Sequence, residues 1–188
     1  MDDDPLHLVR NEPDRLRRGL LLVALLGEAI QEDPIVVGGF AVEAWTDGGY
    51  TTADIDLICR RRDAALAWLE SVGFERRNRH MVHGSLGLAV EIPGTVLDEG
   101  RGAYDRLVQW EIDGRRATLL SVEDTIVDRL AAMVHGHADG EWENALRLLA
   151  AWAGRLDESV LEARAEAEHV SEALARARRW LQVHLEDD

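Results

Sequence analysis

Two aspartates separated by a single residue are the part of this sequence whose chemistry can be argued most directly. Asp54 and Asp56 lie at the start of the apolar run Ile55–Cys59, which is typical of a β-strand. Residues i and i+2 of a strand point to the same side, so both carboxylates should project together. Two neighbouring carboxylates repel each other unless a cation lies between them, and oxygen ligands suit Mg²⁺ or Mn²⁺. The pair therefore predicts a metal site.

A glycine pair upstream could bind the anion that accompanies such a metal. Gly38 and Gly39 lie between the β-branched run Ile35–Val37 and a segment, Phe40–Trp45, that reads as the start of a helix. At a helix start, backbone N–H groups and the helix dipole attract anions, and glycines let a phosphate approach closely. Each feature alone is common. Their order and short separation favour a combined site for a metal and a phosphate.

The elements that position these residues predict an α/β arrangement. Met1–Pro13 is expected to form a polar, frayed end. Apolar periodicity predicts helices over Asp14–Gln31 and Asp63–Val72. Asp113-Gly114 is a hairpin signal between the last two predicted strands. The expected strands are Ile35–Val37, Ile55–Cys59, Phe74–Val82, Leu86–Ile92, Leu107–Ile112 and Arg116–Leu120.

From Ser121 onward the pattern becomes helical. Ser121 and Asp124 fit an N-cap, and further helices are expected over Glu141–Trp152 and Ser159–Leu185. The last helix could pack on the domain, or bind a protein partner or a second copy of the chain. Its apolar stripe comprises Val160, Ala163, Ala167, Val170, Leu174, Ala177 and Leu181. The predicted organisation is an α/β domain over residues 1–120 and a helical region over residues 121–188.

Composition excludes several classes of function. The 188-residue chain has a formal net charge of −15, which argues against broad, non-specific binding of DNA or RNA. All 21 basic residues are arginine, so a cation that binds phosphate here must be arginine or histidine. No apolar run is long enough to cross a membrane. The single cysteine cannot form an internal disulfide, which suits a cytoplasmic protein.

The residues around the glycine and aspartate pairs resemble a known signature. The stretch Val36–Ile58 is similar to that of the polymerase-β-like nucleotidyltransferase superfamily, in which Gly-Gly or Gly-Ser precedes Asp-x-Asp. The fuller pattern, with Gly-Tyr-Thr-Thr-Ala before the first aspartate, resembles the small bacterial branch near the AbiEii-type toxins. That branch also carries Ser-x-Glu-Asp-x-x-x-Asp-Lys-Leu, and the chain reads Ser-Val-Glu-Asp-Thr-Ile-Val-Asp-Arg-Leu from Ser121. The resemblance covers roughly residues 20–150.

This resemblance implies a nucleotidyltransferase-like mixed sheet with flanking helices, followed by a C-terminal helical segment. It also implies metal-dependent transfer of a nucleoside monophosphate from a nucleoside triphosphate to a hydroxyl group. The acceptor could be a protein, an RNA end or a small molecule, and a toxin role is open. Glu91 is the candidate third acid, because a charge in an apolar strand needs a partner. The implied catalytic and metal-binding residues are Asp54, Asp56 and Glu91, and the implied nucleotide-binding residues are Gly38, Gly39, Thr52 and Arg129.

Departures from the pattern leave an alternative function open. The arginine that family members often carry before the threonine is absent at Thr51-Thr52. The usual Arg/Lys-Asp-x-x-Asp-Ala of a later helix reads Gly-Glu-Trp-Glu-Asn-Ala from Gly140. A catalytically inactive relative that binds a nucleotide or a partner is therefore the second hypothesis.

Other polar residues are weaker candidates for the site. Asp98 and Glu99, in a predicted loop, could replace Glu91 as the third acid. A transition-metal site is not expected, because none of the histidines has partners at ligand spacing. The histidines considered are His80, His83, His135 and His137.

Overall fold

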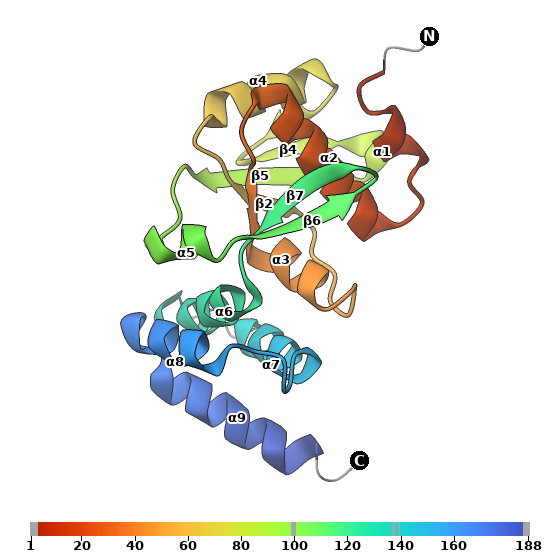
Figure 1. The fold of residues 1–188 in the computed structure, drawn as a ribbon. Helices are drawn as coiled ribbons and strands as arrows, with labels where there is room; N and C mark the ends of the chain where they lie inside the picture. The colour runs from red at the N-terminus through yellow and green to blue at the C-terminus, as the bar shows by residue number, and fades with distance from the viewer. Residues whose placement is uncertain (1–3, 99–100, 137, 139, 186–188) are drawn as a thin grey trace.

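A mixed β-sheet forms the centre of the molecule, in a computed structural model that describes residues 4–98, 101–136, 138 and 140–185 (Figure 1). The strands are β1 (Ile35–Val37), β2 (Ile55–Ile58), β3 (Glu75–Arg77), β4 (His80–His83), β5 (Leu88–Gly94), β6 (Val108–Ile112) and β7 (Arg115–Leu119). They lie side by side in the order β3-β4-β5-β2-β1-β7-β6. β2 pairs antiparallel with β1 and parallel with β5, so it lies in the middle of the sheet.

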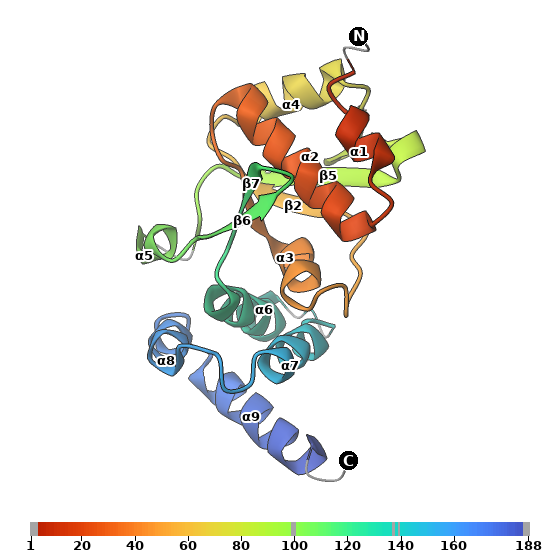
Figure 2. The same ribbon diagram turned by 45° about the vertical axis from the view of Figure 1, so that its right-hand side comes forward.

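Helices cover one face of this sheet and also form the C-terminal end of the molecule (Figure 2). They are α1 (His7–Asn11), α2 (Arg15–Ile30), α3 (Gly38–Trp45), α4 (Arg62–Ser71), α5 (Arg101–Asp105), α6 (Val122–Gly136), α7 (Glu141–Ala151), α8 (Glu158–Ala167) and α9 (Ser171–Leu185), with a 3₁₀ turn, η1, at Gly84–Leu86. α2 and α4 pack on one face, next to α1. α3 lies between the sheet and the group α6–α9.

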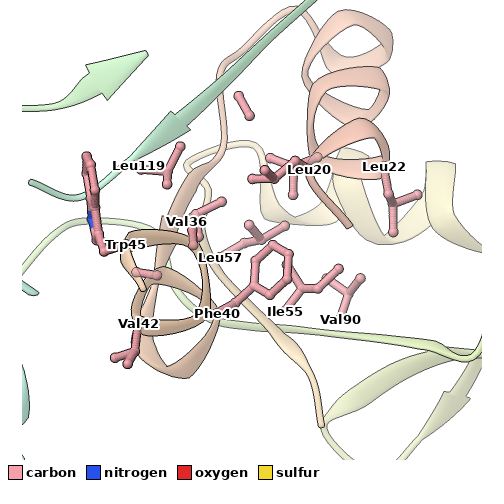
Figure 3. Close-up of a cluster of buried hydrophobic side chains, with 14 of the residues drawn as sticks. Leu20, Leu22, Val36, Phe40, Val42, Trp45, Ile55, Leu57, Val90 and Leu119 are labelled. Atoms are coloured by element: carbon pink, nitrogen blue, oxygen red, sulfur yellow. The ribbon is translucent and has the colours of Figure 1, made fainter. Parts of the chain in front are cut away.

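The main core lies between the sheet and the helices (Figure 3). Leu20 of α2 and Phe40 of α3 pack there with Ile55 and Leu57 of β2, and all four are buried. The alternation of β2 sends these two residues into the core and leaves Asp56 and Ile58 on the opposite, more open face. Because Ile55 and Leu57 are buried in the core, the Asp56 carboxylate lies on the opposite face of the sheet.

Most predicted elements are confirmed, with ends that differ by no more than two residues. Asp14 caps α2 by accepting a hydrogen bond from the Arg17 N–H, and Ser121 caps the helix start at the Asp124 N–H. The mixed α/β fold with flanking helices and a C-terminal helical segment is also confirmed. Within the part of the chain that the structure describes, none of the helices has the length and apolar character that a membrane span requires.

The long C-terminal helix predicted over Ser159–Leu185 is wrong, because the chain turns between α8 and α9. His169 has a left-handed backbone with φ of 58°. Its N–H bonds to the Glu166 carbonyl, and the Val170 N–H bonds to the Ala165 carbonyl. These are the bonds of a Schellman motif, which ends a helix. The predicted stripe also fails in α8, where the buried residues are Leu161 and Ala165.

Other differences concern short elements. Phe74–Val82 is not one strand but a hairpin of β3 and β4, and Asn78 at its turn has φ of 57°. The N-terminal segment is not frayed in the described part, since Leu6 and Val9 are fully buried around α1. α3 begins at Gly38 rather than Phe40, and α5 has no counterpart among the predicted elements.

Candidate functional site

The turn from β1 into α3 lies directly against Asp56. Gly38 has φ of +62°, a conformation that side-chain-bearing residues rarely adopt. A Cβ atom there would lie 2.3 Å from Oδ2 of Asp56. The Gly39 N–H donates to the same oxygen over 3.3 Å. Gly38 therefore leaves room for the Asp56 carboxylate, and Gly39 gives it a backbone amide at the start of the helix.

Strand pairing brings Glu91 and His80 to the same place. β2 and β5 run parallel with Asp56 beside Glu91, and β4 and β5 run antiparallel with His80 beside Glu91. Asp54 precedes β2 by one residue. Side chains on neighbouring strands at paired positions lie on one face of the sheet. The three strands thus place a carboxylate, a second carboxylate and an imidazole in one row.

Asp54, His80 and Glu91 form a compact group that could hold a metal ion. His80 Nε2 lies 2.9 Å from Oδ2 of Asp54 and 3.2 Å from Oε2 of Glu91. One ligand atom from each of the three residues lies within 4.8 Å of the others. Arg79 also pairs with Glu91, with 3.0 Å between its Nε and Oε2. The carboxylates of Asp54 and Glu91 therefore each contact a nitrogen atom of a neighbouring side chain. A metal ion would compete with these nitrogens for the lone pairs of the carboxylate oxygens.

Asp56 lies beside this group and has an unusual acidity. Burial raises the pKa of its carboxyl to about 6, and the negative charges of Asp54 and Glu91 contribute to the shift. The Gly39 N–H and Arg129 act in the opposite direction. A metal ion next to Asp56 would offset its repulsion from Asp54 and Glu91 and so stabilise the ionised carboxylate.

A buried ion pair anchors the segment that carries Asp54. Glu43 of α3 is only 2% exposed, and its Oε2 accepts from Arg15 Nη1 over 2.7 Å and from the Thr52 N–H over 3.0 Å. Arg15 also donates to the Thr52 carbonyl. The Thr52 hydroxyl in turn donates to Oδ1 of Asp54 over 3.3 Å. Arg15 of α2 thus contacts Thr52, although the arginine that family members often carry directly before this threonine is absent.

Arg129 lines a pocket of about 290 Å³ together with Gly38 and Asp56. Its side chain is 12% exposed and forms ion pairs with Asp128 and with Glu141, the latter over 3.0 Å. The pKa of the guanidinium is raised, because these carboxylates more than offset the cost of burial. Arg129 is therefore next to the glycine turn, but its charge is already compensated by two acids.

A larger pocket of about 570 Å³ adjoins the first on the same face of the sheet. The two pockets share Ile58 as a lining residue. β1 contributes Val37 to the smaller pocket and Ile35 to the larger one, two residues apart. Thr118 lines the larger pocket, and its buried hydroxyl has no hydrogen-bond partner among the described residues. A ligand in this pocket could therefore satisfy a polar group that the protein leaves unpaired.

The structure brings together the predicted residues Gly38, Gly39, Thr52, Asp54, Asp56 and Glu91. Arg129 lines the smaller pocket with Gly38 and Asp56. The sequence interpretation considered His80 but set it aside for lack of partners at ligand spacing, whereas the structure places it in a possible metal group with Asp54 and Glu91. Its signal was the strand alternation of β4 and β5, which becomes readable only once the hairpin at Asn78 is recognised.

Other candidate residues lie elsewhere. Asp98 lines the smaller pocket but is not part of the Asp54 group. His83 is buried against Phe74, and His135 is exposed on α6. Glu99 and His137 lie outside the described residues.

Comparison with solved structures identifies the fold. No protein-family model matches the chain, and no curated protein matches its sequence. An antigenic nucleotidyltransferase-like protein from Paracoccidioides brasiliensis is similar, with a TM-score of 0.56 and 15% sequence identity over 88% of this chain and 92% of that one. The chain has a nucleotidyltransferase-like fold. The antibiotic-resistance factor ANT(2'')-Ia is also similar, with a TM-score of 0.51 and 17% identity over 92% of this chain and 96% of that one.

Proposed function

We propose that this protein is a metal-dependent nucleotidyltransferase, which moves a nucleoside monophosphate from a nucleoside triphosphate to a hydroxyl group of an acceptor. One observation carries the proposal. The Gly39 amide at the start of α3 meets Asp56 at a point where Asp54 and Glu91 also lie, so a phosphate site and a carboxylate site would share one space. A metal-bound triphosphate needs both at once.

Each residue has a defined part in this reaction. Asp54, Asp56 and Glu91 would hold Mg²⁺ or Mn²⁺, which would supply positive charge to the reacting phosphate and the leaving group. The amides of Gly38 and Gly39 would bind the terminal phosphates. The acceptor oxygen would attack the α-phosphorus, the bond to the β-phosphate oxygen would break, and pyrophosphate would leave. One of the carboxylates would accept the hydroxyl proton.

Thr52 and Arg129 would support the triphosphate. Thr52 orients Asp54 through its hydroxyl, and a side chain at Gly39 would lie 2.9 Å from that hydroxyl. Arg129 can bind phosphate with two N–H groups if one of its present acids exchanges for the ligand. Its Nε has no hydrogen-bond partner among the described residues, so one donor is already free.

Labelled nucleotides provide the direct test. Purified protein is incubated with Mg²⁺ or Mn²⁺ and each α-labelled triphosphate, with and without cell extract. Asp54→Asn/Asp56→Asn is the inactive variant, and Asp63→Asn on the exposed start of α4 is the matched control. We expect label on an acceptor with wild type and control alone. Absence of both label transfer and metal-dependent nucleotide binding would contradict the proposal.

A catalytically inactive nucleotide- or partner-binding protein is the alternative function. It is favoured by the charges of the smaller pocket, whose described lining includes Asp98 and Asp128 but one cation, Arg129, itself paired with acids. α9 also leaves Trp180 and Val183 exposed, where a protein partner or a second copy could bind. In that case Asp56→Asn would leave partner binding unchanged, whereas it would abolish transfer by an enzyme.

We further propose that the protein belongs to the AbiEii-like branch and acts in the cytoplasm, where nucleoside triphosphates are available. The segment from Ser121 supports this, since Ser121 caps α6 and Arg129 of the same segment lines the pocket beside Gly38. A toxin would arrest growth when expressed, and a neighbouring gene product would relieve the arrest. Harmless expression of the wild type, with the Asp54→Asn/Asp56→Asn variant as comparison, would count against a toxin role.

A further inference from the structure

His80 occupies a position that the proposed chemistry does not by itself require. It stands on β4, two strands from β2, and its imidazole is about a quarter exposed. Nε2 nevertheless faces one oxygen of Asp54 and one of Glu91 at the same time. A histidine that only completed the sheet surface would need neither contact.

The separations match those between neighbouring ligands of one metal ion. With metal–ligand bonds of about 2.1 Å at right angles, adjacent ligand atoms lie about 3.0 Å apart. The observed separations from Nε2 are 2.9 Å to Asp54 and 3.2 Å to Glu91. Since the three ligand atoms also lie within 4.8 Å of one another, an ion could bind all of them once the side chains turn towards it.

We propose that His80 is a metal ligand through Nε2, and that it makes the site select a first-row transition-metal ion of the Mn²⁺ type over Mg²⁺. Imidazole nitrogen suits transition metals, whereas Mg²⁺ is bound almost entirely through oxygen. The inference deepens the proposed function, because this ion would be the cofactor of the transfer. It does not depend on that function, since metal binding can be measured without nucleotide or acceptor.

Arg79 is the group that an incoming ion must displace. Its Nε pairs with the Glu91 oxygen that His80 also contacts, but its side chain is 72% exposed. Although Glu91 itself is mostly buried, the guanidinium of Arg79 can move from the pair into solvent. Arg79 therefore balances the charge of Glu91 until the ion arrives, and of the two side chains only the imidazole of His80 can remain as a ligand.

Metal titration of the full chain tests the selectivity. Protein freed of metal is titrated with Mn²⁺ followed by electron paramagnetic resonance, and Mg²⁺ is measured by competition. We expect His80→Gln to lower the ratio of Mn²⁺ to Mg²⁺ affinity about tenfold or more, since losing even an outer-shell partner of a metal ligand typically costs 10- to 100-fold in affinity. His135→Gln, an exposed histidine on α6, is the matched control and should keep the wild-type ratio.

A spectroscopic measurement on the wild type avoids any dependence on how the variant folds. Electron spin-echo modulation of the Mn²⁺-loaded protein should show a directly bound ¹⁴N nucleus, and His80→Gln should remove it. Mn²⁺ binding without nitrogen coupling, an unchanged affinity ratio in His80→Gln, or no Mn²⁺ binding at all would overturn the inference. Nitrogen-coupled Mn²⁺ in a protein that transfers no nucleotide would instead contradict the proposed function alone.

Discussion

Asp56 has a proposed role in catalysis, and its ionised carboxylate destabilises the folded protein. Its pKa is raised to about 6 by burial and by Asp54 and Glu91, whereas an unfolded aspartate titrates near 3.8. Between these values the folded protein binds the proton more strongly than the unfolded chain. The free energy of unfolding therefore falls as the pH rises from about 4 to about 6, by about 1.4 kcal/mol per unit of pKa shift at most.

Asp56→Asn should stabilise the metal-free protein and abolish transfer. At pH 7.5 we expect a gain of about 1–3 kcal/mol in the free energy of unfolding, because the buried, repelled charge is gone. Near pH 4 the variant and the wild type should be equally stable. Denaturant unfolding across this pH range measures the difference, and Asp63→Asn serves as the control. Added metal should stabilise the wild type more than the variant, which keeps Asp54, His80 and Glu91 but loses the carboxylate beside them. A variant less stable than wild type at pH 7.5 would contradict the shift in the pKa of Asp56.

The sequence was sufficient for those site residues that lie close together along the chain. Gly38 directly follows β1, and Asp54 and Asp56 lie at the start of β2, which pairs with β1, so local spacing determines their arrangement. Glu91 was inferred from a charge in an apolar strand. His80 could not be assigned in this way, because its contact with Asp54 depends on the pairing of β4, β5 and β2, and strand order is not encoded in local periodicity.

At the level of elements, α2 and α3 hold the segment between α3 and β2 through Arg15 and Glu43. Both side chains bond to the backbone of Thr52, and the Thr52 hydroxyl bonds to Asp54. Glu43 is almost fully buried, so it depends on Arg15 for its charge balance. An uncompensated buried carboxylate would destabilise the element that starts at the glycine turn.

Arg15→Met should therefore lower both stability and transfer. We expect a loss of about 2–3 kcal/mol in the free energy of unfolding, at the low end for a buried pair because Arg15 is a third exposed. Transfer should fall at least tenfold at saturating metal, since Thr52 loses its anchor. Arg17→Met, an exposed residue of α2, should change stability by less than about 0.5 kcal/mol. Urea unfolding and initial rates measure the two effects.

A double variant separates these two roles of Arg15. Arg15→Met/Glu43→Leu should regain much of the stability, because no buried charge is left unpaired, while transfer stays low. Recovery of transfer in the double variant would show that the pair does not position Asp54.

The turn between α8 and α9 shows why one long helix was predicted. Helix ends are usually marked by glycine, but here His169 occupies the left-handed position of the Schellman motif. The Ala-, Glu- and Arg-rich sequence on both sides favours a helix throughout. The chain turns because Val170, Leu174 and Ala177 are then buried. Tertiary packing thus overrides a local propensity that contains no stop signal.

His169→Gly should stabilise the protein. Glycine adopts the left-handed conformation without the steric cost that histidine carries, so we expect a gain of about 0.5–1 kcal/mol. Ala163→Gly, on the exposed face of α8, should instead cost about 0.5–1 kcal/mol. Urea unfolding of both variants gives the comparison, and transfer should not change in either. A loss of stability in His169→Gly would mean that its side chain contributes more than the backbone conformation costs.

On the scale of the whole molecule, tryptophans connect the sheet to the C-terminal helices. Trp45 of α3 packs edge to face on Trp110 of β6 and on Trp152 after α7, with ring centroids 5.1 and 5.2 Å apart. The Trp152 indole donates to the Trp45 carbonyl, and the Trp45 indole donates to the Leu120 carbonyl. These contacts hold α6 and α7 beside α3. Arg129 of α6 therefore lies close to the glycine turn at the start of α3, and the two line the same pocket.

The larger pocket then lies on the open face, where the sheet and α5 leave room for an acceptor. It begins at Ile58, two residues beyond Asp56 on β2, a distance of about 7 Å along a strand. A molecule seated in it could extend a hydroxyl to the carboxylates. Its lining includes Gln109 and Thr118 as hydrogen-bonding side chains, and Tyr104 at its edge. We therefore predict that this pocket binds the acceptor rather than the nucleotide.

Gln109→Trp tests this prediction by filling the pocket from an exposed position on β6. We expect the apparent KM for the acceptor to rise at least tenfold, while metal-dependent nucleotide binding stays within twofold of wild type. Glu111→Trp adds the same bulk two residues further along the strand, outside the pocket lining, and should change neither quantity. Weaker nucleotide binding in Gln109→Trp alone would instead place the nucleoside in the pocket. An unchanged KM would move the acceptor to the opposite side of the carboxylates, towards α6 and α7.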